Sequence, residues 1–281
     1  MKRILITGAN SYIGTSFEKY IKANYPNDYI VDTIDMKDGA WREKSFAEYD
    51  SVFHVAGIAH RKETKENAHL YYEVNRDLAI ETAKKAKADG AGQFIFLSSM
   101  SVYGMETGVI TKETKPDPKS HYGKSKWQAE QKILPLKNDA FAVCILRPPM
   151  VYGNGCKGNF QTVVKLVKKL PIFPKVKNER SMIYIDNLSS FVELAISKNL
   201  EGVYFPQNKE YMCTSNMALW ISEKIQKKIY LECITGMCVR FLTLVHPTAK
   251  KAFGSLIYDM ENDKNFCVIS EKDSVKESVT I

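Results

Sequence analysis

Short apolar runs alternate with amphipathic stretches through the first half of the chain. The apolar runs cover residues 4–7, 29–34, 52–56, 94–97 and 142–146. Runs of this length that end at polar or glycine residues are typical of buried strands. We therefore expect five strands before residue 150.

Between these runs, apolar residues recur at the three- and four-residue spacing of a helix. Such stretches begin near residue 13, extend over 70–86 and cover 125–134. Strands that alternate with helices favour βαβ units, in which a parallel sheet carries helices on both faces. The pattern predicts an α/β fold with a doubly wound parallel sheet of the Rossmann type.

The pattern changes after residues 147–149. Helical stripes follow over 160–167 and 188–196, and short strands are expected around 183 and 204. We expect a dinucleotide-binding domain over 1–153 and a smaller C-terminal α/β substrate-binding lobe over 154–281. The chain is expected to return to the first domain near 181–196.

Composition narrows the class of protein. The 281 residues carry 44% hydrophobic side chains and a formal charge of +8. The chain has no arginine-rich arm and no zinc-ligand spacing, so we expect no nucleic-acid partner and no metal site. A solvated lysine surface or phosphate-rich ligands would explain the charge.

The six cysteines form no C-x-x-C pair, and the apolar run at residues 4–6 is too short for a signal peptide. We expect reduced thiols and a cytoplasmic protein. The most apolar stretch, 234–245, is too short to span a bilayer and contains Arg240. A partly buried helix is favoured there over a membrane contact.

The first predicted strand runs into a glycine-containing turn at residues 7–14. Gly8 permits a tight turn, and Gly14 lets the following helix approach the sheet. The start of that helix offers N–H groups to a pyrophosphate.

Asp35 ends the second strand, where a carboxylate can hold ribose hydroxyls and repel a 2′-phosphate. NAD is therefore favoured over NADP, although Lys37 weakens that preference and a solvated turn aspartate is equally consistent with Asp35 alone.

Tyr122 and Lys126 are four residues apart, so they share one face if a helix begins there. A tyrosine with a pKa near 10 becomes a usable base only when a cation favours the phenolate. Ser99 follows a buried strand, where its hydroxyl can donate to a developing carbonyl or alkoxide oxygen.

Together these segments resemble the extended short-chain dehydrogenase/reductase family, in particular its nucleotide-sugar epimerases, dehydratases and reductases. The matching segments are TGANSYIG (7–14), HVAG (54–57), Asn75, SSMSVYG (98–104), Tyr122 with Lys126, RPPMVYG (147–153) and RSMIYID (180–186). Residues 157–161 and the stretch leading to 188 look most like small bacterial enzymes of surface-polysaccharide pathways.

The resemblance implies site residues. Ser99, Tyr122 and Lys126 would be catalytic. The residues expected to bind NAD, with NADP kept open, are Gly8, Asn10, Ser11, Tyr12, Ile13, Gly14, Asp35, Met36, Ala56, Gly57, Asn75, Ser98, Tyr122, Lys126 and Pro149. The residues expected to bind a UDP-sugar are Ser99, Ser101, Tyr122, Asn159 and Arg180. A homodimer is the family's usual assembly.

Three departures limit the function. Ser11 replaces the middle glycine of the cofactor loop, and Met150 replaces an asparagine that many epimerases use for substrate. Met100 and Ser101 stand where dehydratases carry acidic residues, which disfavours 4,6-dehydration. The first hypothesis is a UDP-hexose or UDP-N-acetylhexosamine 4-epimerase. A 4-keto-sugar-nucleotide reductase is the alternative, and a non-catalytic dinucleotide-binding regulator is a remote third.

Overall fold

A computed structural model describes residues 1–59, 61–245, 247–259 and 267–280, with the backbone alone at 240, 244, 245, 247 and 248. The chain forms two compact units. Unit 1 contains Met1–Gly104, Lys115–Pro148 and Leu188–Pro206. Unit 2 contains Met105–Thr114, Pro149–Asn187 and Gln207–Ile281.

This division differs from the expected single boundary at residue 153. Residues 105–114 join unit 2 because their strand pairs with a strand near the C-terminus, Gly108 opposite Leu256. The return to unit 1 covers Leu188–Pro206, further along the chain than the expected 181–196. The pairing of residues 108–110 with 256–258 and the return of the chain to unit 1 both join residues far apart in the sequence. The apolar pattern along the chain could not reveal them.

Unit 1 is built on a six-stranded parallel sheet of order β10-β6-β4-β3-β1-β2. The predicted strands are all present, and the doubly wound α/β fold is confirmed. The strands are β1 (Lys2–Thr7), β2 (Tyr29–Ile34), β3 (Ser51–His54), β4 (Gln93–Leu97), β6 (Ala142–Leu146) and β10 (Gly202–Tyr204). Every residue of β3, β4 and β6 is buried, as expected where helices cover both faces.

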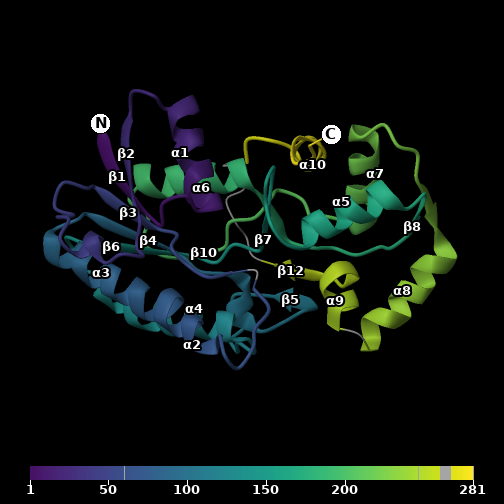
Figure 1. The fold of residues 1–281 in the computed structure, drawn as a ribbon, viewed down its shortest axis with the longest axis horizontal. Coiled ribbons are helices and arrows are strands. Elements are labelled where there is room, and N and C mark those ends of the chain that lie inside the picture. Colours follow the sequence, from purple (N-terminus) through teal and green to yellow (C-terminus); the bar gives the residue numbers. More distant parts are fainter. Residues whose placement is uncertain (60, 246, 260–266, 281) are drawn as a thin grey trace. The chain divides into compact units, whose positions relative to one another are not determined.

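Helices lie on both faces of this sheet, α1 and α6 on one and α2, α3 and α4 on the other (Figure 1). Their bounds are α1 (Tyr12–Asn24), α2 (Ala68–Tyr72), α3 (Leu78–Asp89), α4 (His121–Ile133) and α6 (Ile185–Ser197), with a π-helical turn at Glu73–Asp77 and short 3₁₀ turns at Ala40–Arg42, Met100–Tyr103 and Leu134–Leu136. On one face, the rings of Phe17 in α1 and Phe53 in β3 meet edge to face at 5.3 Å. On the other, small residues of α3, Ala79 and Ala83, pack in a core with Phe94.

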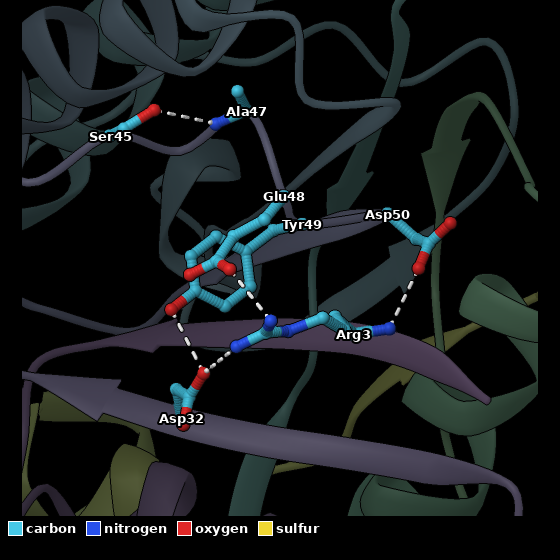
Figure 2. Close-up of polar contacts among 7 residues, drawn as sticks. All are labelled: Arg3, Asp32, Ser45, Ala47, Glu48, Tyr49 and Asp50. Atoms are coloured by element: carbon cyan, nitrogen blue, oxygen red, sulfur yellow. Dashed lines mark hydrogen bonds and ion pairs between the residues drawn. The ribbon is translucent and has the colours of Figure 1, made fainter.

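Polar side chains join the amino end of β1 to β2 and to the loop before β3 (Figure 2). The Arg3 guanidinium contacts Glu48 at 2.6 Å and Asp32 at 3.1 Å, and the Tyr49 hydroxyl donates to Asp32 at 2.9 Å. The Arg3 backbone N–H donates to Asp50 at 2.7 Å. Because parallel strands share one direction, the opposite edge collects all their carboxyl ends, and the predicted site residues of unit 1 follow those ends.

Unit 2 contains three parallel strand pairs, β5–β12, β7–β9 and β8–β11. Its strands are β5 (Gly108–Ile110), β7 (Met150–Tyr152), β8 (Ile172–Pro174), β9 (Met182–Tyr184), β11 (Tyr230–Glu232) and β12 (Leu256–Tyr258). Its helices are α5 (Asn159–Lys169), α7 (Thr214–Lys224), α8 (Cys233–Val245), α9 (Pro247–Phe253) and α10 (Glu271–Glu277).

The expectation of a partly buried helix at 234–245 is confirmed. The helix is α8, in which Gly236 is buried and Val239 is half-buried, while most of the large apolar side chains are exposed. Ile234, Met237 and Phe241 are exposed by 64%, 58% and 71%. The buried position of this helix is Gly236, where an added Cβ would lie 2.2 Å from the carbonyl oxygen of Lys175. The smallest residue faces the protein, and the large apolar ones face outward.

Candidate functional site

The turn after β1 is shaped by close backbone approach. Gly8 adopts a φ of 103°, and a Cβ there would lie 2.8 Å from the backbone nitrogen of Ala56. Asn10 also has a positive φ, of 63°, which asparagine tolerates better than most residues. The turn therefore packs directly against Ala56, two residues after β3, which is the close approach expected of a cofactor-binding loop.

Ser11 caps the first helix. Its hydroxyl accepts a hydrogen bond from the Gly14 N–H at 3.2 Å, one turn into α1. A Cβ on Gly14 would lie 2.7 Å from that hydroxyl and 3.0 Å from a methyl of Ile6. The serine that departs from the glycine pattern thus orders the helix start, where Tyr12 and Ile13 form the first turn. The positive end of the helix dipole lies here, which suits a diphosphate.

The residues after β2 lie at the surface. The Asp35 carboxylate accepts from the Lys37 N–H at 3.1 Å, and the Lys37 ammonium lies 3.9 Å from it. Met36 is buried beside them. Lys37 therefore partly offsets the charge of Asp35, and the role of Asp35 toward a ribose stays a prediction.

At the exit of β3, the side chain of Asn75 holds the backbone. Its amide oxygen accepts from the Ile58 N–H at 2.7 Å, and its amide nitrogen donates to the Ile58 carbonyl at 3.0 Å. Asn75 belongs to the π-helical turn, a feature frequent at functional sites. A Cβ on Gly57 would lie 3.0 Å from the Asn75 oxygen and 3.5 Å from the Lys126 ammonium. Asn75 therefore fixes the segment in which Ala56 and Gly57 lie.

His54 ends β3 as a buried packing residue. Its Nδ1 lies 2.7 Å from the Thr7 hydroxyl, and its ring stacks on that of Phe94. Burial, with a smaller effect of the Lys126 charge, lowers the pKa of His54 to about 3. The ring is neutral at physiological pH and contributes to packing.

The serines after β4 have different surroundings. Ser98 is buried, and its hydroxyl donates to Glu130. Ser99 is only partly buried; its hydroxyl donates to that of Ser101 at 3.1 Å and is near enough to Tyr122 to lower the pKa of that phenol. The structure thus brings Ser99, Ser101 and Tyr122 together. The side chain of Ser98 points instead to a buried carboxylate.

Tyr122 lies in the first turn of α4, which begins four residues earlier than predicted. The Ser120 hydroxyl accepts from the Gly123 N–H at 3.0 Å, and the Glu63 carboxylate accepts from the N–H groups of His121 and Tyr122 at 2.9 Å each. Glu63 is a positioning residue that the sequence analysis missed, because nothing local links residues so far apart in the chain.

Burial raises the pKa of Tyr122, the nearby Ser99 hydroxyl lowers it in part, and Tyr71 raises it. Lys126 does not shift the pKa of Tyr122, because its ammonium points away from the phenol. It donates to the Leu97 carbonyl at 2.7 Å and lies 4.6 Å above the ring of Phe96. Burial lowers the pKa of Lys126 to about 7, against an opposing effect of Glu130.

A buried ion pair, also missed by the sequence analysis, lies behind these groups. The Arg147 guanidinium contacts the Glu130 carboxylate at 2.6 Å and donates to the Tyr103 hydroxyl at 2.8 Å. Because Glu130 also accepts from Ser98, the pair joins α4 to the exits of β4 and β6. The R-P and Y-x-x-x-K motifs contain or adjoin these residues, but only the fold shows that they meet.

Three predicted site residues belong to unit 2. Pro149 is buried, and Asn159 is exposed at the start of α5. The Arg180 guanidinium donates to the carbonyl of Gly254 at 2.7 Å, after the end of α9, and burial lowers its pKa. Among the described residues, no group of three or more histidine, cysteine or acidic side chains could hold a metal ion.

Comparison with known proteins agrees with this geometry. Residues 4–205 match the NAD dependent epimerase/dehydratase family. The chain is 33% identical over 253 residues to a UDP-glucose 4-epimerase of Vibrio cholerae, covering 80% of this chain and 76% of that one. It is 26% identical to an N-acetyl-alpha-D-glucosaminyl-diphospho-ditrans,octacis-undecaprenol 4-epimerase of Escherichia coli O157:H7, covering 97% and 88%.

A solved structure of similar fold is the UDP-glucuronic acid 4-epimerase of Bacillus cereus in complex with NAD. It aligns with a TM-score of 0.75 at 19% identity and covers 98% of this chain and 95% of that one. The family match spans the whole of the site described in unit 1. This chain belongs to the NAD dependent epimerase/dehydratase family.

Proposed function

We propose that the protein is an NAD-dependent 4-epimerase of a UDP-hexose or UDP-N-acetylhexosamine. The observation that carries this proposal is the cluster of the Ser99, Ser101 and Tyr122 side chains, in which Ser99 acts on the pKa of Tyr122, with Lys126 one turn further along α4. A tyrosine hydroxyl beside a serine hydroxyl can pass a proton to and from a substrate hydroxyl. That is what oxidation and re-reduction of a sugar hydroxyl requires.

The residues around this pair fit a dinucleotide. Gly8 and Gly57 let the turn after β1, the exit of β3 and Asn75 lie close together, and the capped start of α1 suits a diphosphate. Asp35 suits the ribose of NAD, while Lys37 beside it leaves NADP open. When bound, the nicotinamide would accept a hydride from C4 and return it.

The proton chemistry falls to Tyr122. Its raised pKa makes the neutral phenol the resting form. The Ser99 hydroxyl lowers this pKa in part, and added positive charge in the cofactor-bound site would favour the phenolate further. Tyr122 would then take the C4 hydroxyl proton while Ser99 donates to the same oxygen. Lys126, with a pKa near neutrality, can gain or lose a proton at the back of this site.

The substrate contacts proposed in unit 1 are Ser99, Ser101 and Tyr122. Asn159 and Arg180, which belong to unit 2, stay predictions from the sequence. Arg180 would have to exchange its bond to the Gly254 carbonyl for a diphosphate oxygen. A homodimer in the cytoplasm is part of the proposal. None of the six cysteines, all of which the structure describes, forms a disulfide, which supports a reducing compartment.

Two alternatives rest on specific observations. Met150 in place of an asparagine favours a 4-keto-sugar reductase, which would use the same residues in one direction. The Escherichia coli relative acts, by its name, on a sugar diphosphate attached to undecaprenol. A sugar diphosphate is common to both attachments, so the C4 chemistry would be the same.

The test is incubation of the protein with a trace of NAD⁺ and either UDP-galactose or UDP-N-acetylgalactosamine, without external reductant. Chromatography should show conversion to the gluco isomer. Tyr122→Phe should lower turnover by about 100-fold or more with NAD binding unchanged, whereas Tyr25→Phe, which removes a hydroxyl beyond the far end of α1, should not. No conversion by a protein that binds NAD overturns the UDP-sugar epimerase. A 4-keto-sugar and a polyprenyl-diphosphate sugar are then the next substrates.

A further inference from the structure

The exposed apolar side chains of this protein are concentrated in one part of unit 2. Large hydrophobic residues exposed on the described surface number eleven, and seven of them lie between residues 170 and 242. Four belong to α8: Ile234, Met237, Phe241 and Leu242. We call these four the outer face of α8.

The outer face is a continuous helical stripe. Ile234, Met237 and Phe241 are spaced at i, i+3 and i+7, and the exposed Cys238 fills the i+4 position. Residues at this spacing project from one side of a helix. A contiguous exposed stripe of this kind, unlike single surface hydrophobics, marks an interaction site.

The opposite side of α8 fixes its orientation. Gly236 lies against the carbonyl of Lys175, just after β8, and the Lys175 N–H donates to the Glu232 carbonyl at 3.0 Å immediately before α8 begins. Figure 1 shows α8 beside β8. The helix is therefore held by its small-residue side, which leaves the outer face available.

Lysines surround the strand on which α8 packs. Between residues 165 and 177 the chain carries five exposed lysines and no acidic residue: Lys165, Lys168, Lys169, Lys175 and Lys177. Exposed Leu170 and Ile172 lie among them, and Lys228 lies 5.1 Å above the ring of Tyr230, which pairs with Ile172. Exposed apolar and cationic side chains thus alternate along β8 and the residues that flank it.

From this combination we propose that the outer face of α8, with the neighbouring lysines, docks on the surface of an anionic membrane. Apolar side chains that enter the boundary between headgroups and acyl chains, flanked by lysines that attract anionic lipid, are the two signals required for stable interfacial binding. The proposal goes beyond the 4-epimerase function and does not depend on it.

A membrane-spanning α8 and a dimer formed through the outer face of α8 both fit these observations less well. The 13 residues of α8 extend about 20 Å, less than the roughly 30 Å of a hydrocarbon core. No helix in the described part of the chain is long and apolar enough to cross a bilayer. In a symmetric dimer through this face, lysines would meet lysines, and like charges oppose association.

Vesicle flotation of the full chain tests the proposal. The protein should float with vesicles of phosphatidylcholine and phosphatidylglycerol, float less with phosphatidylcholine alone, and be partly released by high salt. Ile234→Glu with Phe241→Glu should weaken binding at least about tenfold, since two side chains no longer enter the lipid. Lys175→Gln with Lys177→Gln should lose roughly fivefold per lysine on anionic vesicles only.

The matched control is Ile30→Glu with Val268→Glu, which adds the same charge at two exposed apolar residues away from α8. It should bind as the wild type does, and circular dichroism should show all variants folded. A fluorophore on Cys238, in a Cys233→Ser background, should be quenched by brominated lipid. UDP-sugar turnover in solution should be unchanged by the α8 variant, which keeps this test separate from that of the 4-epimerase.

Two results would overturn the proposal. One is a wild-type protein that does not float with anionic vesicles or whose Cys238 label is not quenched. The other is an α8 variant that binds vesicles like the control while sedimentation shows that it has lost a dimer present in the wild type. That second result would make the outer face a contact between two copies of the chain.

Discussion

At the scale of single residues, the site depends on buried charges whose partners are far apart in the sequence. Glu130 accepts from Ser98 and pairs with Arg147, while Lys126 donates to a carbonyl with its pKa brought near neutrality. Each of these groups is costly to bury alone and is stabilised by the neighbours that the fold supplies. Stability and catalytic geometry are therefore linked through the same few side chains.

Glu130→Gln should lower the free energy of unfolding by about 3 kcal/mol or more, because it leaves the buried Arg147 guanidinium without its carboxylate. Urea unfolding measures this. Glu201→Gln is the matched control, since Glu201 forms an exposed ion pair with Lys137 at 2.7 Å and should cost about 1 kcal/mol or less. Equal losses for the two variants would show that the buried pair is not a stabilising unit.

Lys126 predicts a pH dependence of stability. Its pKa is about 7 in the folded protein and near 10.5 in the unfolded chain. Between these values the unfolded chain holds the proton and the folded protein does not, so stability rises with pH in this window, by up to about 1.4 kcal/mol per pH unit. Unfolding at pH 7.5 and 9 should show this gain in the wild type and in Lys124→Met, an exposed control on α4. Lys126→Met should lack it, and an equal gain in that variant would contradict the assignment.

At the scale of elements, the turn between β1 and α1 is the most constrained connection of unit 1. Gly8 combines a positive φ with backbone contact, whereas Gly90 at the end of α3 has a φ of 92° and nothing within 4 Å of an added Cβ. A substitution at Gly90 therefore introduces backbone strain alone, whereas one at Gly8 introduces strain and a steric clash with Ala56.

Gly90→Ala should cost about 1 kcal/mol from strain alone and leave NAD affinity unchanged. Gly8→Ala should cost more than that and weaken NAD binding at least about tenfold, because the turn must move away from Ala56. Thermal unfolding and calorimetric titration with NAD compare the pair. If both variants bound NAD like the wild type, the turn would not be part of the cofactor site.

At the scale of the whole molecule, neither unit is a continuous segment. Unit 1 takes β10 and most of α6 from beyond residue 187, where the side chains of Leu188, Val192 and Ala195 are fully buried. A fragment of residues 1–153 lacks this edge strand and helix.

We expect that fragment 1–153 shows no cooperative thermal transition by circular dichroism, while the full chain does. Without α6, apolar side chains on one face of the sheet are exposed to water. A fragment that unfolds cooperatively would instead support a boundary near 153.

The sequence alone determined the strands of the unit 1 sheet, its α/β class and the candidate site motifs. Period-two and period-3.6 patterns are local, and so are the glycine turn at 7–14, the pair Tyr122 and Lys126, and the serines after β4. In a doubly wound fold these motifs reach the same sheet edge because all parallel strands end there. The resemblance to extended short-chain dehydrogenases was readable for the same reason.

The tertiary structure decided what depends on partners distant in the chain. It paired Glu63 with the start of α4, Glu130 with Arg147, and residues 105–114 with 256–258. It also turned Lys126 toward the Leu97 carbonyl, and it turned the apolar side of α8 outward because only Gly236 fits against Lys175. Hydrophobic spacing predicts that a helix has an apolar face; whether that face meets protein or solvent depends on packing that local sequence does not encode.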